Sequence, residues 1–306
     1  MELLKSLCEV RAPSGNEGPL KDFIVQYVRD HHHAWKVSPV IIADEDLQDS
    51  LILQFGTPRT AVMAHMDSIG FTVRYQDQLI PIGSPKAEDG YRLVGADHLG
   101  PVLCELVVYE SKKDKQLRYK FGRGIARGTE LVFECDFRET PDFIQSCYLD
   151  NRLGVYNALR LAETLEDGLL VFSCGEEHGG GSVPYLTRFI YERFQVRQYL
   201  ISDVTWTTDG VAHGQGVALS MRDRNIPRRS FLNKIIEQVE QTEVPFQLEV
   251  EGTGSSDARE LQQAAYPTDW CFIGAPVSYA HSPNEKVHRA DIDSMLALYR
   301  HLMRSL

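Results

Sequence analysis

The sequence predicts an α/β fold that carries a small inserted β domain, and three observations lead to this prediction. Short apolar runs of strand length alternate with amphipathic stretches of helical spacing toward both ends of the chain. Between them, residues 76–140 have β-like runs, many turns and no convincing helix. The 306 residues, 43% of them hydrophobic, can bury a large core. We therefore expect an α/β domain made of residues 1–75 and 141–306, interrupted by a β domain.

The first part of the chain is expected to form two helices and then strands. Met1–Cys8 is the first helix, and Pro13–Gly15 breaks it. Glu17–Arg29 is the second helix, because its apolar residues recur at helical spacing on one face. His31–His33 are expected to end this helix rather than to bind a metal. The strands that follow are predicted at Ala34–Val40, Ser50–Phe55, Thr60–Ala64 and Ile69–Tyr75.

The rest of the chain is expected to alternate strands and helices after the insert. Within the insert, the β-like runs are Leu93–Val94, Val102–Tyr109 and Glu130–Cys135. Beyond it, helices are predicted at Asn151–Leu165, Val183–Phe194, Pro227–Glu240 and Ala290–Met303. Strands are predicted at Leu169–Phe172, Gln198–Ser202, Val217–Ser220, Phe246–Val250 and Trp270–Ile273. This alternation is typical of a sheet with helices on its faces.

Two adjacent glutamates occupy a position where α/β proteins build their sites. Glu176 and Glu177 follow a short buried strand, and the glycines of residues 179–181 then turn the chain into a helix. Sites of open α/β sheets lie at the carboxyl ends of strands. Neighbouring carboxylates there can take different partners, so one can bind a metal while the other handles protons. A lone Glu-Glu pair is more often a solvated acidic turn, so this interpretation depends on other residues.

Five potential metal ligands lie at or just after a predicted strand end, or at the start of a helix: His65, Asp150, Glu177, Asp203 and His281. Two imidazoles and three carboxylates at one edge of a sheet fit two adjacent Zn(II) or Co(II) ions, with one carboxylate bridging them. Asp150 precedes a helix, so its alternative role is that of an N-cap. Taken together, the five residues indicate a dinuclear metal site.

The net charge and the cysteine content limit the kinds of partner and the cellular compartment that we expect for this protein. The formal net charge is −11 and no basic cluster stands out, which argues against a nucleic-acid partner. The six cysteines have no CxxC spacing, and the sequence has no signal peptide and no apolar run that could span a bilayer. We therefore expect a cytoplasmic protein with reduced thiols and no membrane partner.

Six motifs carry a resemblance to a known family: AHMDSIG at 64–70, LDNRLG at 149–154, GEE at 175–177, SDVT at 202–205, GSSDA at 254–258 and YAHSP at 279–283. In this order, over nearly the whole chain, they resemble the tetrahedral (TET) aminopeptidases, which are dinuclear-metal glutamyl and deblocking aminopeptidases. The resemblance implies a mixed-sheet exopeptidase domain flanked by helices, with the small β domain inserted at 76–140.

The same resemblance implies a role for each site residue. One divalent ion, zinc or cobalt, would be held by His65 and Asp203, the other by Glu177 and His281, with Asp150 bridging both. Glu176 would be the general base that activates a metal-bridging water. Asp67 would hold the imidazole of His65. Three features depart from the family's pattern, namely Ser68, His178 and the short segment Trp206–Gly214.

The predicted function is a metal-dependent aminopeptidase that removes N-terminal residues from peptides. A metal-dependent amidohydrolase or deacylase acting on small N-acylated molecules is the main alternative. A binding module that merely kept the fold is disfavoured, because Glu176 and all five ligand types are present. A glucanase, a label that relatives of this family have carried, is disfavoured because paired histidines have no task in glycoside chemistry.

Assembly is the last expectation. The resemblance implies a homo-oligomer, from a dimer up to a dodecamer, whose subunits pair through the insert at 76–140. The insert contains apolar strand candidates at Leu106–Tyr109 and Leu131–Phe133. We expect that a small β domain cannot cover these strands alone, so that a partner subunit covers them.

Overall fold

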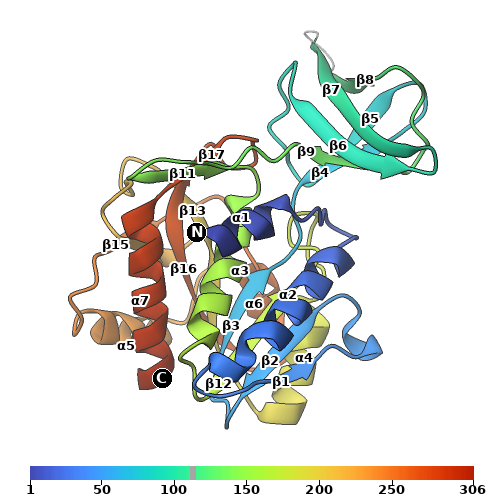
Figure 1. Cartoon of the computed structure of the whole chain (residues 1–306). Coiled ribbons are helices and arrows are strands. Elements are labelled where there is room, and N and C mark those ends of the chain that lie inside the picture. Colours follow the sequence, from blue (N-terminus) through green and yellow to red (C-terminus); the bar gives the residue numbers. More distant parts are fainter. Residues whose placement is uncertain (111–114) are drawn as a thin grey trace.

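The computed structural model describes residues 1–110 and 115–306, which form an α/β body and a small β-barrel beside it (Figure 1). The body contains an eleven-stranded mixed sheet, and six strands close the barrel. Both chain termini lie in the body (Figure 1). This architecture confirms the predicted α/β class with a small β domain. Among the helices of the described residues, none is long and apolar enough to cross a lipid bilayer.

The large sheet has a parallel centre and antiparallel edges. Its central strands, in spatial order, are β12 (Gly168–Ser173), β3 (Thr60–His65), β13 (Gln198–Trp206) and β16 (Asp269–Ser278). The edges are β2 (Leu51–Phe55) and β1 (Val40–Ile42) on one side, and β17 (Glu285–His288), β11 (Phe143–Ser146) and β10 (Arg138–Glu139) on the other. β14 (Val217–Arg222) pairs with β16 and with β15 (Phe246–Val250). Because the four central strands are parallel, their carboxyl ends meet at one edge.

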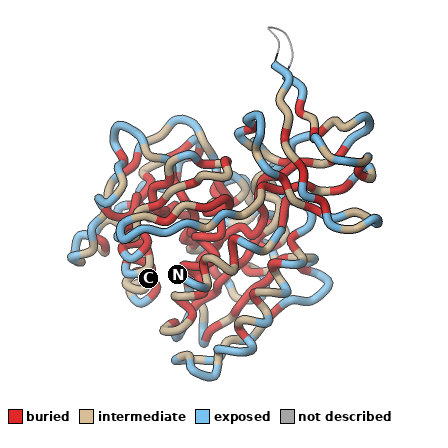
Figure 2. Tube along the Cα trace, turned by 45° about the horizontal axis from the view of Figure 1, so that its top comes forward, coloured by how far each residue is buried: buried red, intermediate tan, exposed pale blue. Residues whose placement is uncertain are grey.

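Helices cover both faces of the sheet. One face packs against α1 (Glu2–Glu9), α2 (Gly18–His31), α3 (Leu149–Ala162), α5 (Arg229–Val239) and α7 (Arg289–Ser305), and the other against α4 (Val183–Phe194) and α6 (Ala258–Gln263). Along β12, Leu170 and Phe172 join the first core while Leu169 and Val171 join the second. Burial on both faces explains why the central strands are continuous apolar runs, and Figure 2 shows this buried interior.

A fully buried arginine connects helix α3 to the segment that carries the site. The guanidinium of Arg152 donates to the carbonyl oxygens of Leu7 at 3.1 Å and Val10 at 3.2 Å, and also to that of Met66. A buried charge is tolerated only when its donors are satisfied. Arg152 therefore fixes the end of α1 and the residue after His65 against the start of α3.

The barrel has a core of its own. Its strands are β4 (Gly70–Val73), β5 (Gln78–Ile82), β6 (Arg92–Asp97), β7 (Gly100–Glu110), β8 (Lys115–Lys120) and β9 (Glu130–Phe133). They bury Leu106, Leu131 and Phe133 inside the barrel. The barrel therefore covers Leu131–Phe133 by itself, whereas Leu106–Tyr109 is covered only in part, since Tyr109 is 58% exposed. The large apolar side chains that the barrel does expose are Tyr75, Ile80, Leu99, Leu103 and Tyr109.

The barrel strands have different limits from the insert expected at 76–140. They begin at Gly70, inside the range assigned to the body, and end at Phe133. β10 then already belongs to the large sheet, where it pairs with β11. Residues 111–114 of the expected insert lie outside the described residues. The division of the chain into domains at 76 and 140 stays a prediction.

Several other expectations need correction. No strand forms over Ala34–Val40, since His32–Ala34 is a 3₁₀ turn and β1 begins only at Val40. Pro39, just before β1, has no N–H to donate to a ladder. Asp203 lies within β13 rather than after it, because residues 203–206 continue to pair with β16. The sequence also missed β5, β8, β10, β11, β17 and α6.

Candidate metal centre

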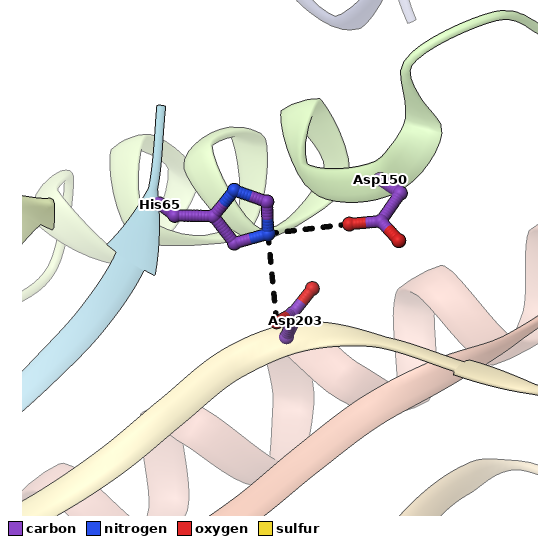
Figure 3. Close-up of side chains that lie close together, drawn as sticks. All are labelled: His65, Asp150 and Asp203. Atoms are coloured by element: carbon purple, nitrogen blue, oxygen red, sulfur yellow. Dashed lines mark ion pairs between the residues drawn. The ribbon is translucent and has the colours of Figure 1, made fainter. Parts of the chain in front are cut away.

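The five predicted ligands converge at the carboxyl edge of the parallel strands. His65 ends β3, Asp203 lies on the neighbouring β13, and Glu177 follows β12 on the other side of β3. Asp150 comes from the start of α3, and His281 from the loop between β16 and β17. Figure 3 shows how a strand end, a helix start and a second strand bring His65, Asp150 and Asp203 together.

The ligand atoms form two groups that share one carboxylate. In the first, His65 Nε2 lies 3.2 Å from Asp150 Oδ1 and 3.7 Å from Asp203 Oδ2 (Figure 3). In the second, His281 Nε2 lies 3.3 Å from Asp150 Oδ2 and 3.4 Å from Glu177 Oε2. The ligand atoms of each group lie within 4.8 Å of one another. Each aspartate oxygen of Asp150 thus faces a different imidazole, which is the position that a bridging carboxylate requires.

Asp150 does not serve as a helix cap. The backbone at Asp150 and Asn151 is not helical, and the side-chain oxygen of Asn151 accepts the Gly154 N–H at 2.8 Å. An oxygen that accepts an N–H three residues on performs the capping role. Asn151 therefore caps the regular part of α3, and the Asp150 carboxylate is left to face the two histidines.

The chemistry of this donor set fits divalent cations. Glu177 Oε1 is buried and has no hydrogen-bond partner among the described residues. Burial raises the pKa of Glu177 well above its ordinary value, and the nearby Asp150 charge adds to this. Burial alone would lower the pKa of His65, but the surrounding carboxylates, Asp203 first, outweigh it and raise that pKa. A bound cation would favour ionised carboxylates and neutral imidazoles, so the residues present suit metal ions.

Asp67 fixes three neighbours of the centre from beneath it. Its carboxylate is fully buried and accepts the backbone N–H groups of Glu176 at 3.1 Å and Glu177 at 3.0 Å, and the Ser14 hydroxyl at 2.5 Å. His65 Nδ1 lies 3.2 Å from the Asp67 carbonyl oxygen and 3.4 Å from its carboxylate. Asp67 thus sets both the turn after β12 and the orientation of the His65 ring.

Glu285 positions Asp150 and His281 as Asp67 positions the turn after β12. The sequence analysis missed this residue. This buried carboxylate accepts the N–H of Asp150 at 3.0 Å and the N–H of His281 at 2.7 Å. His281 has a φ of 64°, an uncommon backbone conformation that this bond helps to hold. On its other side, His281 Nδ1 lies 2.9 Å from the Ser84 hydroxyl. In the sequence, Glu285 reads as an ordinary strand glutamate, and only its closeness to His281 hints at a role.

Glu176 and Asp257 add two more acidic groups. Glu176 lines the same cavity as the five ligands, and burial together with the neighbouring Glu177 charge raises its pKa well above the ordinary value. Asp257, in the GSSDA motif, is buried and accepts the Ser173 hydroxyl at 2.6 Å. Burial raises the pKa of Asp257 to about 7. The motif thus places a further carboxylate behind the centre, which the sequence did not assign.

The three departures from the family's pattern lie around the centre. His178 Nδ1 accepts the Gly83 N–H at 2.9 Å and is not among the residues that line the cavity. It therefore flanks the site beside the Ser84 loop. Ser68 is buried and donates to the Ala12 carbonyl oxygen at 3.2 Å. Trp206, the first residue of the short segment, lines the cavity.

Comparisons with known proteins agree with this picture. The profile of the family described as M42 glutamyl aminopeptidase matches residues 107–298. A protein of Acetivibrio thermocellus, whose name marks it provisionally as an aminopeptidase, is 26% identical over 97% of this chain and 96% of its own length.

Two solved structures share the fold. An aminopeptidase of the archaeon Desulfurococcus kamchatkensis, 22% identical, covers 100% of this chain and 94% of its own with a TM-score of 0.86. The TET1 peptidase of Pyrococcus horikoshii is 19% identical, and the match covers 99% of this chain and 98% of that peptidase with a TM-score of 0.81. That peptidase is described as assembling into a tetrahedron or a large octahedral shell. At these identities the structural likeness shows the fold alone.

We expect the Asp67→Asn variant to bind metal about 10- to 100-fold more weakly than the parent protein. An asparagine amide has one acceptor oxygen and one donor nitrogen, so it cannot accept both N–H groups of the turn. Titration of the metal-free protein with Co(II), followed by visible absorption, measures the affinity. Ser14→Ala, which removes one hydrogen bond to the same carboxylate, is the control and should lose less. Equal Co(II) affinity in Asp67→Asn and the parent would contradict the positioning role.

Proposed function

Because the chain belongs to the M42 glutamyl aminopeptidase family, we propose that it is a metal-dependent aminopeptidase that hydrolyses N-terminal residues from peptides. One observation carries this proposal. Two ligand groups share Asp150, and Glu176 lines the cavity onto which they face. Paired metal ligands beside a buried carboxylate are the parts that metal-assisted hydrolysis of an amide needs.

The proposed ligands divide between two divalent ions, zinc or cobalt. His65 and Asp203 would hold one, Glu177 and His281 the other, and Asp150 would contact both. When bound, such ions polarise a carbonyl and lower the pKa of a water to about 7. Asp67 and Glu285 keep the ligands in place through the backbone contacts described above.

Glu176 is the proposed general base. Its backbone is anchored by the Asp67 carboxylate at 3.1 Å, so its side chain is held at the cavity wall. Burial and the adjacent carboxylate shift its pKa upward, toward the pH at which a general base works best. Glu176 would take a proton from the attacking water and pass it to the leaving amine.

An amidohydrolase or deacylase that acts on small N-acylated molecules would use the same residues. One feature favours the aminopeptidase. Within the described ranges 1–110 and 115–306, the cavity is lined by carboxylates and by no lysine or arginine, and such a surface attracts a protonated amino terminus. An N-acyl group carries no positive charge and gains nothing from these carboxylates.

We also propose that the protein forms a homo-oligomer paired through residues 76–140, from a dimer up to a dodecamer. Two facts support this. The barrel exposes five large apolar side chains, Tyr75, Ile80, Leu99, Leu103 and Tyr109, of the kind that subunit interfaces cover. A relative of the same fold is described as a tetrahedral or octahedral assembly.

The cytoplasm is the proposed compartment. All six cysteines are free thiols, and four of them are buried. Free thiols persist in a reducing compartment, whereas secreted proteins commonly pair them. Zinc and cobalt sites without thiolate ligands are compatible with this location.

We expect Glu176→Gln to abolish turnover while metal binding survives, and Glu177→Gln to weaken metal binding itself. The amide at position 176 cannot accept a proton, so the rate should fall by about a hundred- to ten-thousand-fold. Hydrolysis of aminoacyl-nitroanilides gives the rate, and elemental analysis after dialysis gives the metal content of both variants. Activity of Glu176→Gln close to that of the parent would refute the assigned role. Faster hydrolysis of N-acetylated amino acids than of free-amine substrates would favour the deacylase.

Light scattering tests the assembly. We expect a particle larger than one chain at every protein concentration measured, and a smaller particle when Leu99 and Tyr109 are both replaced by aspartate. The two new aspartates would bury negative charges in the interface between subunits, and a buried charge without a partner is costly. A monomer that persists at all concentrations would rule out the oligomer. A dimer would support pairing through the barrel and exclude the closed shell.

A further inference from the structure

The cavity beside the candidate metal centre holds more carboxylates than metal ions and a general base require. Its volume is about 290 Å³, and among the residues that the structure describes, seven carboxylates but no lysine or arginine line it. Three of the seven, Asp223, Glu249 and Glu251, lie outside the proposed catalytic set. They come from β15 and the residues that follow β14 and β15, two strands that pair in parallel. The cavity therefore has a second acidic wall, built by adjacent strands.

The carboxylates of this second wall lack ion-pair partners. Two divalent ions would balance the four negative charges of the three carboxylate ligands and Glu176. The remaining three carboxylates form no ion pair with any basic side chain in the part of the chain that the structure describes. The guanidinium of Arg222, next to Asp223 in sequence, donates to the Asp223 carbonyl oxygen at 3.1 Å rather than to its carboxylate. Unbalanced buried charge of this kind calls for a cationic ligand.

Several observations indicate that this ligand is organic and not a third metal ion. Among the described residues, Asp223, Glu249 and Glu251 do not form a group of ligand atoms close enough to hold a metal. Glu249 accepts the Thr205 hydroxyl, and Asp223 accepts the Asn225 N–H, so each is held in its own place on the wall. A cavity with separate anchored carboxylates suits an extended cation.

Apolar side chains complete the fit. Trp206 and Phe272 line the same cavity. The Trp206 ring lies over the loop that follows β15, where a Cβ on Gly254 would come within 3.7 Å of it. Long aliphatic stems pack on such surfaces while their charged ends reach polar groups, and an aromatic face also attracts a cation. Lysine and arginine side chains have this combination of stem and charge.

We propose that this cavity binds the side chain of the substrate's N-terminal residue and takes lysine or arginine in preference to apolar or acidic residues. This inference rests on the proposed aminopeptidase function. The proposed preference differs from the one in the family's name, glutamyl aminopeptidase. A glutamate side chain would be repelled by three carboxylates that carry the same negative charge. Like charges placed together in this way disfavour the wrong ligand.

Rates on a matched substrate set test the proposal. We would measure kcat/KM of the metal-loaded protein on lysyl-, arginyl-, norleucyl- and glutamyl-p-nitroanilide. Norleucine has the four-carbon stem of lysine without the charge. Lysyl and arginyl substrates should exceed the norleucyl substrate by about tenfold or more, as for a hydrogen bond to a charged group, and the glutamyl substrate should be the poorest. Equal or better hydrolysis of the norleucyl or glutamyl substrate would overturn the proposal but leave the aminopeptidase intact. No hydrolysis of any substrate would overturn both.

Variants of Glu251 locate the effect. Glu251 is only partly buried and forms no ion pair in the described part of the chain, so Glu251→Gln removes a charge at little structural cost. It should lower the ratio of lysyl to norleucyl rates by about threefold or more, as for the loss of a partly exposed charge pair. Glu251→Lys should bring the glutamyl rate above the lysyl rate.

Glu243 provides the control, because it is exposed and is not among the cavity's lining residues. Glu243→Gln should keep the parent ratio. An unchanged ratio in both Glu251 variants would contradict the assignment. If both fail to fold, the lysyl and norleucyl comparison on the parent protein decides the proposal alone.

Discussion

The site depends on one buried carboxylate that is satisfied by backbone N–H groups. Asp67 is completely shielded from solvent and accepts N–H groups from Glu176 and Glu177, together with the Ser14 hydroxyl. Burying a carboxylate is costly unless several donors surround it. The turn after β12 can supply these donors in one conformation, so the requirement of Asp67 fixes where both glutamates lie. Metal binding and proton transfer, the two functions proposed for that pair, therefore depend on a turn whose geometry is fixed by its hydrogen bonds to Asp67.

The cavity next to Asp67 is strongly acidic, and this charge determines which ligands the cavity can bind. Glu285 anchors Asp150 and His281 in the same manner as Asp67 anchors the turn, so two buried acids hold a centre that is itself acidic. No lysine or arginine of the described part of the chain lines the cavity. In our proposal, ligands would balance this charge: metal ions at the carboxyl ends of the parallel strands, and a cationic side chain at the wall formed beside β14 and β15. Metal use and substrate preference would then have the same electrostatic origin.

The parts of this arrangement that sequence could predict are those with strong local patterns. The continuous apolar strand before Glu176, and the placing of His65 at a strand end, follow from burial on both sheet faces. Parallel order then brings residues far apart in the chain to one edge. Glu285 could not be predicted, because a lone glutamate before a lysine in a short strand has the pattern of a surface residue. In the barrel, β5 was missed because Pro81 interrupts its apolar residues and its burial does not alternate along the strand.

The most direct test of the account is the metal content of the purified protein. If two shared ligand groups and their buried supports have the role described, elemental analysis should find up to two zinc or cobalt ions per chain. Removal of the ions with EDTA should abolish aminopeptidase activity, and their return should restore it. A protein that takes up no transition metal, and whose activity EDTA leaves unchanged, would contradict the account at its centre.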